Sequence, residues 1–294
     1  MPPRPVIVGI GEVLWDVFPD GEHFGGAPAN VAMHAAALGA AAYMISAVGP
    51  DARGDAALAR LDSAGVNRTA VAQLLGRPTG AVNVSVDSKG QPTFDIAADV
   101  AWDYLPWSQT VEQVAERADA ICFGTLAQRG SVSRTTIRRA VESTPPRTRR
   151  LFDVNLRQNY YDASVVLSSL ELANAIKLND DELPVIARLC KIPPIDILGQ
   201  LRMLCDWFGL TLAALTRGPL GSVLVTPTEF HESAAPATVV RDTVGAGDAF
   251  TATLLVGLLE RRPLVEISAR ANAVAAYVCS QPGATPPIPP ELRW

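Results

Sequence analysis

Short apolar segments that alternate with helical patterns constrain the fold of this chain more than any other feature. The first segment, Val6–Ile10, is rich in β-branched residues, which is typical of a strand buried on both faces. Pro28 suits the first turn of a helix and Gly39 its C-terminal end, so we expect a helix over residues 28–38. The alternation continues, with strands predicted at 42–48, 121–124, 151–154, 175–178, 212–216 and 222–225 and helices at 54–64, 133–142 and 199–208. This order predicts an α/β fold with a mainly parallel central sheet flanked by helices.

Two stretches, residues 13–25 and 79–102, break this alternation. Residues 81–86 alternate apolar and polar side chains as a half-buried strand does, and residues 87–90 have the composition of a hairpin turn. We expect the two stretches to pair as a small separate sheet, inserted in a single domain that spans residues 1–294. A second sheet over one mouth of an α/β domain would act as a lid that excludes water.

Composition excludes several classes of protein. The 294 residues are 48% hydrophobic, which is enough for one large α/β domain with a small appendage. The formal net charge is -5 and there is no basic stripe, so nucleic acid is not an expected partner. The chain contains no apolar run of membrane-spanning length, and its first residues reach Gly9 before a signal sequence could form. We therefore expect a soluble, cytoplasmic protein with no membrane contact.

Cysteine and histidine also limit the chemistry. The four cysteines lie far apart in the sequence, among apolar neighbours and without a CxxC pair, so we expect reduced core residues rather than disulfides or a zinc site. Only three histidines are present, too few for a histidine-rich metal centre. Any reaction must then depend on carboxylates, amides and a bound cofactor.

The strongest local motif is Asp242–Phe250, in which a glycine turn leads into a helical pattern at 251–259. Glycine lets the backbone approach a ligand closely, and the free N–H groups of a helix N-terminus form an anion site. A hydroxyl beside Asp248 could lose its proton to that carboxylate while it attacks a phosphate, with the amides of Gly245, Ala246 and Gly247 stabilising the charge. The alternative is that Asp248 only caps the helix.

Together with a second motif, this segment resembles the PfkB, or ribokinase-like, family of carbohydrate kinases over almost the whole chain. The second motif is Gly25–Ala32, followed downstream by Gly49–Gly54. The resemblance implies a ribokinase-like fold and transfer of the γ-phosphate of ATP to a monosaccharide. It is closest to bacterial fructokinases, so fructose is the expected substrate and fructose 6-phosphate the product.

The resemblance also assigns the catalytic and nucleotide-binding residues. Asp248 would be the catalytic base, and the amides of Gly245, Ala246 and Gly247 its anion hole. Asn179 and Glu182 match an Asn-x-x-Glu motif that organises Mg²⁺, its waters and the phosphates; the alternative for Glu182 is an exposed acidic helix start. The loop with Thr216, Gly218 and Gly221 would contact ATP, although its residues alone suggest a hairpin turn, and Asn272 would border the adenine.

A monovalent cation, K⁺, is a further implication of the resemblance. Asp242 and the carbonyls of Val244, Val278 and Gly283 would line its site. Pro287 stands where some relatives carry a hydroxyl side chain, which weakens the assignment.

For the sugar, the resemblance points to Asp16, Gly25, Gly26, Asn30 and Arg157. A carboxylate that accepts two sugar hydroxyls discriminates strongly against sugars that lack them. Asp16 could instead be a solvent-exposed turn residue, and Arg157 could form a structural salt bridge. Trp102 has two readings as well, contact with the sugar or packing of the lid.

Several functions compete with fructose phosphorylation. A dinucleotide-dependent oxidoreductase fails, because the third glycine of its fingerprint would fall at Leu14. A non-catalytic sugar-binding regulator remains, as do kinases of ribose, 2-keto-3-deoxygluconate, a nucleoside or a phosphosugar. The exposed edges of the lid sheet also favour a homodimer.

Overall fold

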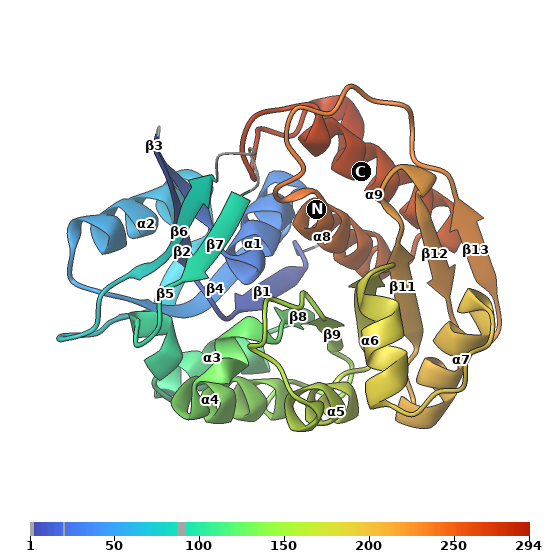
Figure 1. Cartoon of the computed structure of the whole chain (residues 1–294), viewed down its shortest axis with the longest axis horizontal. Coiled ribbons are helices and arrows are strands. Elements are labelled where there is room, and N and C mark those ends of the chain that lie inside the picture. The colour runs from blue at the N-terminus through green and yellow to red at the C-terminus, as the bar shows by residue number, and fades with distance from the viewer. Residues whose placement is uncertain (1–2, 20, 87–91) are drawn as a thin grey trace.

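The computed structural model describes residues 3–19, 21–86 and 92–294, and within them the chain forms two sheets (Figure 1). The larger sheet has the strand order β13-β12-β11-β10-β9-β8-β1-β4-β5. Pairing is parallel from β5 to β11 and antiparallel from β11 to β13. Its strands are β1 (Val6–Ile10), β4 (Ala41–Val48), β5 (Asn67–Gln73), β8 (Ala120–Phe123), β9 (Arg149–Asp153), β10 (Ala175–Asn179), β11 (Leu212–Thr216), β12 (Ser222–Val225) and β13 (Phe230–Ser233).

Helices cover both faces of this sheet (Figure 1). One face carries α1 (Ala27–Ala37), α2 (Ala52–Ser63), α8 (Ala246–Leu259) and α9 (Leu264–Cys279). The other carries α3 (Gln109–Glu116), α4 (Ser131–Glu142), α5 (Ala163–Leu172), α6 (Glu182–Leu189) and α7 (Ile197–Phe208).

Each face has its own hydrophobic core, because successive side chains of a strand point to opposite sides. In β1, Ile7 packs with the α1 and α8 side, whereas Val8 and Ile10 pack with the opposite side. All three side chains are fully buried. Burial on both faces explains why these strands are apolar without alternation.

The second sheet has the order β3-β2-β6-β7 and consists of the two stretches that break the alternation in the sequence. Its strands are β2 (Leu14–Phe18), β3 (Gly21–Gly25), β6 (Gly80–Val86) and β7 (Pro92–Ile96). The predicted pairing of these stretches is therefore confirmed. The turn predicted at 87–90 lies outside the described residues.

The bounds and the number of elements differ in part from those predicted from the sequence. Helix α4 begins two residues before the predicted start, and β5, β13, α3, α5 and α6 are elements that the apolar pattern alone did not predict.

Trp102 is almost fully buried and lies against β6, where a side chain at Gly80 would collide with its indole nitrogen. It therefore packs the base of the small sheet.

The strand order determines where a ligand can bind. From β1 the sheet continues through β4 and β5 in one direction and through β8 to β11 in the other. Helices that follow β1 and β8 lie on opposite faces, and the carboxyl ends of such strands are the usual ligand site of these sheets. A small cavity lined by Val31, Cys122 and Asp153 lies there, and we call this region the crevice. The segments after β1, β9, β10 and β11 all carry residues assigned from the sequence.

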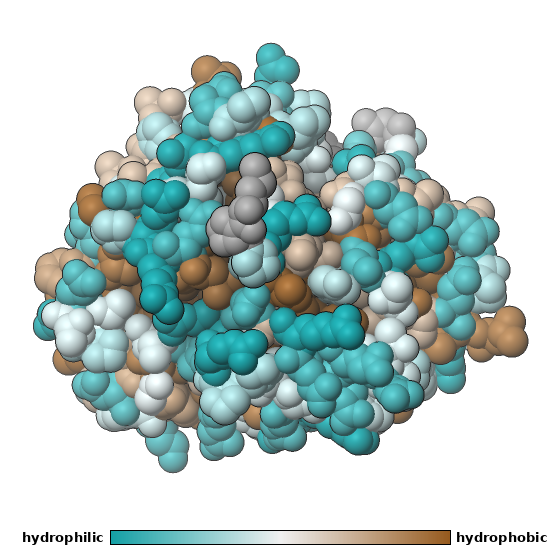
Figure 2. Space-filling model, turned by 180° about the vertical axis from the view of Figure 1, so that it is seen from behind, coloured by the Kyte–Doolittle hydropathy of each residue, from teal (hydrophilic) through white to brown (hydrophobic). Residues whose placement is uncertain are grey.

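The surface of the molecule is mostly hydrophilic on the face seen from behind (Figure 2). Figure 2 shows the face opposite to that of Figure 1, where hydrophilic residues cover most of the area and hydrophobic ones show between them. Among the described helices, none combines the length and apolar character needed to span a bilayer.

Candidate active site

Asp248 lies in the first turn of α8, at the bottom of the crevice. The helix begins at Ala246 with Gly245 as its N-cap, and no side chain caps it. Asp248 therefore does not act as the cap, and that alternative is wrong. Its Oδ2 instead accepts a hydrogen bond of 2.8 Å from Nδ2 of Asn30, a buried residue of α1. The N-terminal and C-terminal motifs of the sequence thus meet at this carboxylate.

The glycine turn before Asp248 has no room for side chains. Gly245 has φ of 78°, and a Cβ there would lie 2.1 Å from the carbonyl oxygen of Ala284. Glycine is required at this position for both reasons. No side chain of the described residues caps the helix, and of its first N–H groups only that of Ala246 makes a bond, a long one of 3.4 Å to the carbonyl of Thr243, so the turn can still bind an anion.

A buried ion pair lies beneath this turn. Nζ of Lys177 in β10 is 3.1 Å from Oδ1 of Asp153, the last residue of β9. Oδ2 of Asp153 accepts a hydrogen bond of 2.8 Å from the hydroxyl of Thr251 in α8. All three residues are buried, so the pair links two strands of the sheet to the helix that carries Asp248.

The environment of Asp248 favours its protonated form. Desolvation, and next the charge of Asp153, raise the pKa of Asp248 to about 6, against the opposing effects of Asn30, Lys177 and Arg157. A carboxyl with a pKa in this range is ionised at neutral pH yet is a stronger base than an ordinary aspartate. General bases are tuned in this way.

Glu182 lies at the start of α6 and is buried, so the alternative of an exposed acidic helix start is wrong. Its two carboxylate oxygens accept hydrogen bonds from the backbone N–H groups of Leu156 and Asn179, at 2.9 and 2.8 Å. The side chain of Asn179 in turn accepts from the N–H of Glu182 at 2.8 Å. The Asn-x-x-Glu segment is thus a closed turn that fixes the carboxylate at the crevice.

The residues predicted for the sugar gather where β2, β3 and α1 meet. Asp16 lies on β2, partly buried, and a side chain on Gly25 would come within 2.8 Å of its Oδ2. It is therefore not a loop residue as the alternative had it. Gly26 has φ of 109° and packs on the backbone of Glu12.

Arg157 is exposed, and among the described residues it forms no salt bridge. Desolvation raises the pKa of Glu12 to about 7 and that of Asp16 to about 6, and the charge of Arg157 opposes both shifts. The same charge acts on Asp248. One arginine therefore lies within electrostatic range of three acids from different elements.

Glu12 follows β1 and was not assigned from the sequence. It is 2% exposed, and its Oε2 has no hydrogen-bond partner among the described residues. Lys177 and Asp153 were also not assigned as site residues. A charged residue inside or directly after a strand buried on both faces is the signal that could have identified them, because such burial is costly without a partner.

The predicted nucleotide loop connects two antiparallel strands, β11 and β12, so it is also a hairpin. Gly218 is exposed with φ of 52°, and a Cβ on Gly221 would be 2.0 Å from the carbonyl oxygen of Ser233. That oxygen accepts a hydrogen bond of 3.1 Å from the side chain of Asn272. Asn272 and the loop thus meet at the end of β13. Thr216 ends β11 and its hydroxyl points back to the carbonyl of Leu178 at 3.4 Å.

The residues predicted for a monovalent cation also come together. Asp242 accepts hydrogen bonds of 3.0 Å from the backbone N–H groups of Val244 and Gly283. The carbonyl of Val278 accepts from the N–H of Gln281 at 3.0 Å. The carboxylate therefore joins the segment before α8 to the segment after α9.

Comparison with known proteins adds to this geometry. Residues 12–291 match the pfkB family carbohydrate kinases. The fructokinase of Klebsiella pneumoniae is 31% identical over 261 residues, which cover 85% of this chain and 83% of that protein. An uncharacterized sugar kinase from Pyrococcus horikoshii, solved in complex with ATP, is 27% identical over 95% of this chain and 93% of its own, with a TM-score of 0.78.

The fructokinase of Xylella fastidiosa, solved with bound ATP, has a TM-score of 0.83 at 23% identity, over 95% of this chain and 93% of its own. At this level of sequence identity, the similarity between the two proteins shows a shared fold. The α/β architecture expected from the sequence, with a large mostly parallel sheet and a small second one, is therefore confirmed.

Proposed function

The chain belongs to the pfkB family of carbohydrate kinases, and on this basis we propose that it transfers the γ-phosphate of ATP to a hydroxyl of fructose, with Asp248 as the base. The observation that carries the proposal is the position of Asp248. It stands at an uncapped helix N-terminus behind a glycine turn, is held by Asn30, and has its pKa raised to about 6, first by desolvation. An anion site and a base are thus adjacent.

The proposed reaction uses these two parts together. The sugar hydroxyl gives its proton to the carboxylate of Asp248 as its oxygen forms a bond to the γ-phosphorus. The bond between that phosphorus and the bridging oxygen breaks, and ADP leaves. The N–H groups of Gly245, Ala246 and Gly247 stabilise the negative charge on the transferred group.

Mg²⁺ fits the residues present. Within the described residues, no group of three or more His, Cys, Asp or Glu side chains is close enough to enclose a metal ion. Mg²⁺ usually keeps several waters and needs only one or two carboxylates together with substrate phosphates. Glu182 and Asn179 would orient those waters, and the ion would supply charge neutralisation on the phosphates.

Fructose is proposed from two features. The curated relatives include fructokinases, of which the Klebsiella pneumoniae protein is 31% identical to this chain. Asp16 offers two acceptor oxygens and Arg157 a cation within electrostatic range of it, which suits a sugar with several hydroxyls. Arg53 is paired with Glu22 at 2.7 Å, which leaves little cationic capacity for a sugar that already carries a phosphate.

A K⁺ requirement and a homodimer through the small sheet stay predictions. β3 and β7 are the edge strands of that sheet, and an exposed edge can pair with a second copy. Light scattering would test the dimer. Replacing K⁺ with Na⁺ in the assay would test the cation.

The experiment that tests the function measures ADP release from Mg·ATP with fructose, ribose, 2-keto-3-deoxygluconate, adenosine and fructose 1-phosphate. Asp248→Ala runs beside the wild type. We expect turnover of fructose and a loss of kcat by about two to four orders of magnitude in the variant. Turnover of another sugar alone would keep the mechanism and replace the substrate.

A non-catalytic sugar-binding regulator is the second candidate, because a kinase fold can bind without turnover. Calorimetric binding of fructose with no ADP release for any sugar would favour it. The base geometry of Asp248 argues for the kinase.

A further inference from the structure

Lys177 is a buried cation that the proposed reaction does not yet use. It lies in the middle of β10, whose other residues up to Leu178 are apolar and buried, and it is only 6% exposed. Its ammonium is fixed by Asp153, at 3.1 Å, and Asp153 is held by Thr251. A buried lysine is costly unless carboxylates compensate its charge.

The ammonium lies directly under the glycine turn. A Cβ placed on Gly247 would be 3.1 Å from Nζ of Lys177. Gly247 immediately precedes Asp248, so the cation lies close to the backbone that carries the base. A larger cationic group at this position would crowd Gly247.

The identity of the residue supports a specific requirement. Lys177 is one of only three lysines, with Lys89 and Lys191, among the 25 basic residues of the chain. Arginine fills nearly every other basic position. A compact ammonium needs less room between β9, β10 and α8 than a planar guanidinium does.

The charges around Asp248 are unbalanced toward the negative. Facing it are Asp153 from β9, Lys177 from β10, Arg157 from the loop after β9 and Glu12 from the end of β1, with the neutral amide of Asn30 from α1. Glu182 also contributes, through its effect on Lys177. The thiol of Cys122 in β8 borders the same group, and desolvation and then Asp153 hold its pKa well above the usual range.

Lys177 remains charged in this setting. Desolvation works against its ammonium form, but Asp153, Glu182 and Asp248 together raise its pKa. In return its charge lowers the pKa of Asp248, which desolvation and Asp153 raise. Without Lys177, Asp153 and Asp248 would be two carboxylates in one site, of which one is forced to hold a proton.

We propose that Lys177 is a positioning residue of the phosphoryl transfer, whose ammonium, fixed by Asp153 beneath Gly247, keeps Asp248 ionised and able to accept the hydroxyl proton. The inference rests on the proposed function of Asp248 as base. It assigns to the Asp153–Lys177 pair a role in reactivity in addition to its role in holding β9, β10 and α8 together.

The test is the pH dependence of kcat/KM for fructose at saturating Mg·ATP, compared between the wild type and Lys177→Met. We expect the acid limb of the variant to move to higher pH by about one unit, because loss of the Lys177 charge removes an effect that lowers the pKa of Asp248. Lys177→Arg keeps the charge and should keep the limb near its wild-type position, with a lower kcat because it crowds Gly247.

A second measurement does not depend on turnover. Carboxyl-carbon NMR of the ligand-free protein, with the Asp248 signal assigned from its loss in Asp248→Asn, should show the same upward shift in Lys177→Met. The matched control is Lys191→Met, which removes a lysine from an exposed position outside the crevice. This control should leave both titrations unchanged.

Lys177→Met leaves Asp153 buried without its partner and can fail to fold. The double variant Asp153→Asn with Lys177→Met removes the pair without a change in net charge, and its Asp248 titration should return toward the wild type. An unshifted titration in folded Lys177→Met, or an equal shift in Lys191→Met, would overturn the inference. Full activity of Asp248→Asn would instead refute the proposed function itself.

Discussion

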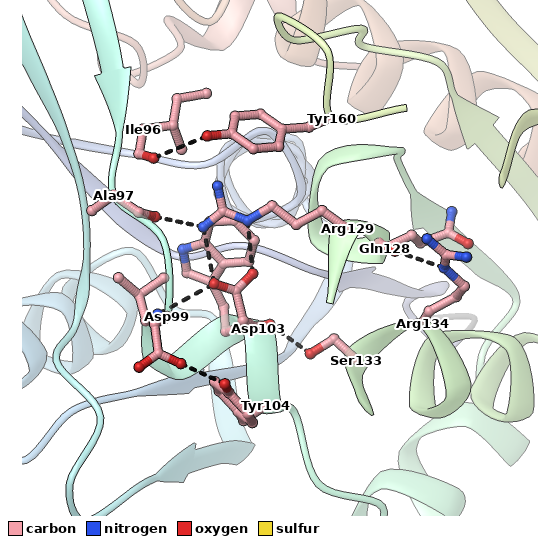
Figure 3. Close-up of polar contacts among 12 residues, drawn as sticks. Ile96, Ala97, Asp99, Asp103, Tyr104, Gln128, Arg129, Ser133, Arg134 and Tyr160 are labelled. Carbon is pink, nitrogen blue, oxygen red and sulfur yellow. Dashed lines mark hydrogen bonds and ion pairs between the residues drawn. The ribbon is translucent and has the colours of Figure 1, made fainter. Parts of the chain in front are cut away.

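Two charge clusters of this protein differ in the balance between their carboxylates and their cations. The first, which we call the Arg129 cluster, consists of Arg129, Asp103 and Tyr160, which Figure 3 labels, together with Trp102. Nε and Nη2 of Arg129 bond the two carboxylate oxygens of Asp103 at 2.8 and 2.9 Å. The guanidinium also lies over the rings of Trp102 and Tyr160, with centroid distances of 4.1 and 4.7 Å.

The second cluster surrounds Asp248 and has more carboxylates than cations. Asp153, Glu182, Glu12 and Asp248 share two cations, of which Lys177 is buried and Arg157 is exposed. The pKa of Asp248 is raised to about 6, chiefly by desolvation. A cluster whose charges balance stabilises an interface between elements, whereas a surplus of one charge sign produces a group poised to exchange a proton.

Cavity size alone would point to the wrong cluster. A depression of about 330 Å³ lies beside Arg129 and is lined by Asp99, Asp103, Tyr104 and Tyr160. Its two acids, Asp99 and Asp103, are paired with Arg77 and Arg129, so this depression has no surplus of carboxylates over cations. The surplus of carboxylates, not the cavity volume, distinguishes the proposed active site.

Asp248→Asn should produce the largest effect on activity with the least effect on stability. The amide cannot accept the hydroxyl proton, so kcat should fall by about two to four orders of magnitude. Repulsion between Asp153 and the Asp248 carboxylate disappears, so the melting temperature at pH 8 should stay the same or rise. ADP release measures the change in kcat, and thermal unfolding measures the change in melting temperature. A large loss of stability would show that Asp248 has a structural role like that of Arg129.

Arg129→Met should show the opposite pattern. It leaves Asp103, with a side chain 10% exposed, buried and without its partner, which commonly costs about 3–5 kcal/mol in the free energy of unfolding. The acid limb of the pH–rate profile should not move. Urea unfolding measures the loss, and Arg129→Met combined with Asp103→Leu should recover part of it because both charges are gone.

The second cluster was only partly predictable from the sequence. Asp248 and its glycine turn form one continuous motif, and Glu182 belongs to another. Within each motif, sequence spacing alone brings the backbone groups together. The pairing of Lys177 with Asp153 joins residues 24 positions apart, and that of Thr251 with Asp153 joins residues 98 apart. Such contacts arise from strand order and helix packing, which periodicity does not reveal.

The same limit applies to the fold. Buried strands such as β1 and β10 were evident from composition, because strands covered on both faces are mostly apolar. The charged Lys177 of β10 is the exception. The edge strand β13 carries Phe230, His231 and Glu232, a mixed pattern that gives no such signal. The alternatives for Asp16 and Glu182, both of which assumed exposure, failed because burial of a single acid depends on tertiary contacts.

Glu12→Gln should change the pH dependence of stability. The pKa of Glu12 is raised from 4.5 to about 7, first by desolvation, so the folded state prefers the protonated form. The stabilisation is complete below the unfolded pKa and is lost as the pH rises through the folded one. The variant should therefore gain about 3 kcal/mol relative to the wild type between pH 5 and pH 8.

Urea unfolding at the two pH values measures this difference, and Glu142→Gln at an exposed position is the matched control. Equal pH dependence in Glu12→Gln and the wild type would mean that Glu12 is already compensated. It would then resemble Asp103, and the second cluster would hold one surplus charge fewer.

Tyr160→Phe should have the smallest effect. The hydroxyl of Tyr160 donates to the carbonyl of Ile96 in β7 at 3.4 Å, a long hydrogen bond, while its ring remains over Arg129. Loss of the hydroxyl should lower the free energy of unfolding by less than about 1 kcal/mol. Tyr160→Leu also removes the ring from the cation and should cost about 1 kcal/mol more. If the two variants cost the same in urea unfolding, the ring adds nothing to a guanidinium that Asp103 already pairs, and the ion pair alone stabilises the Arg129 cluster.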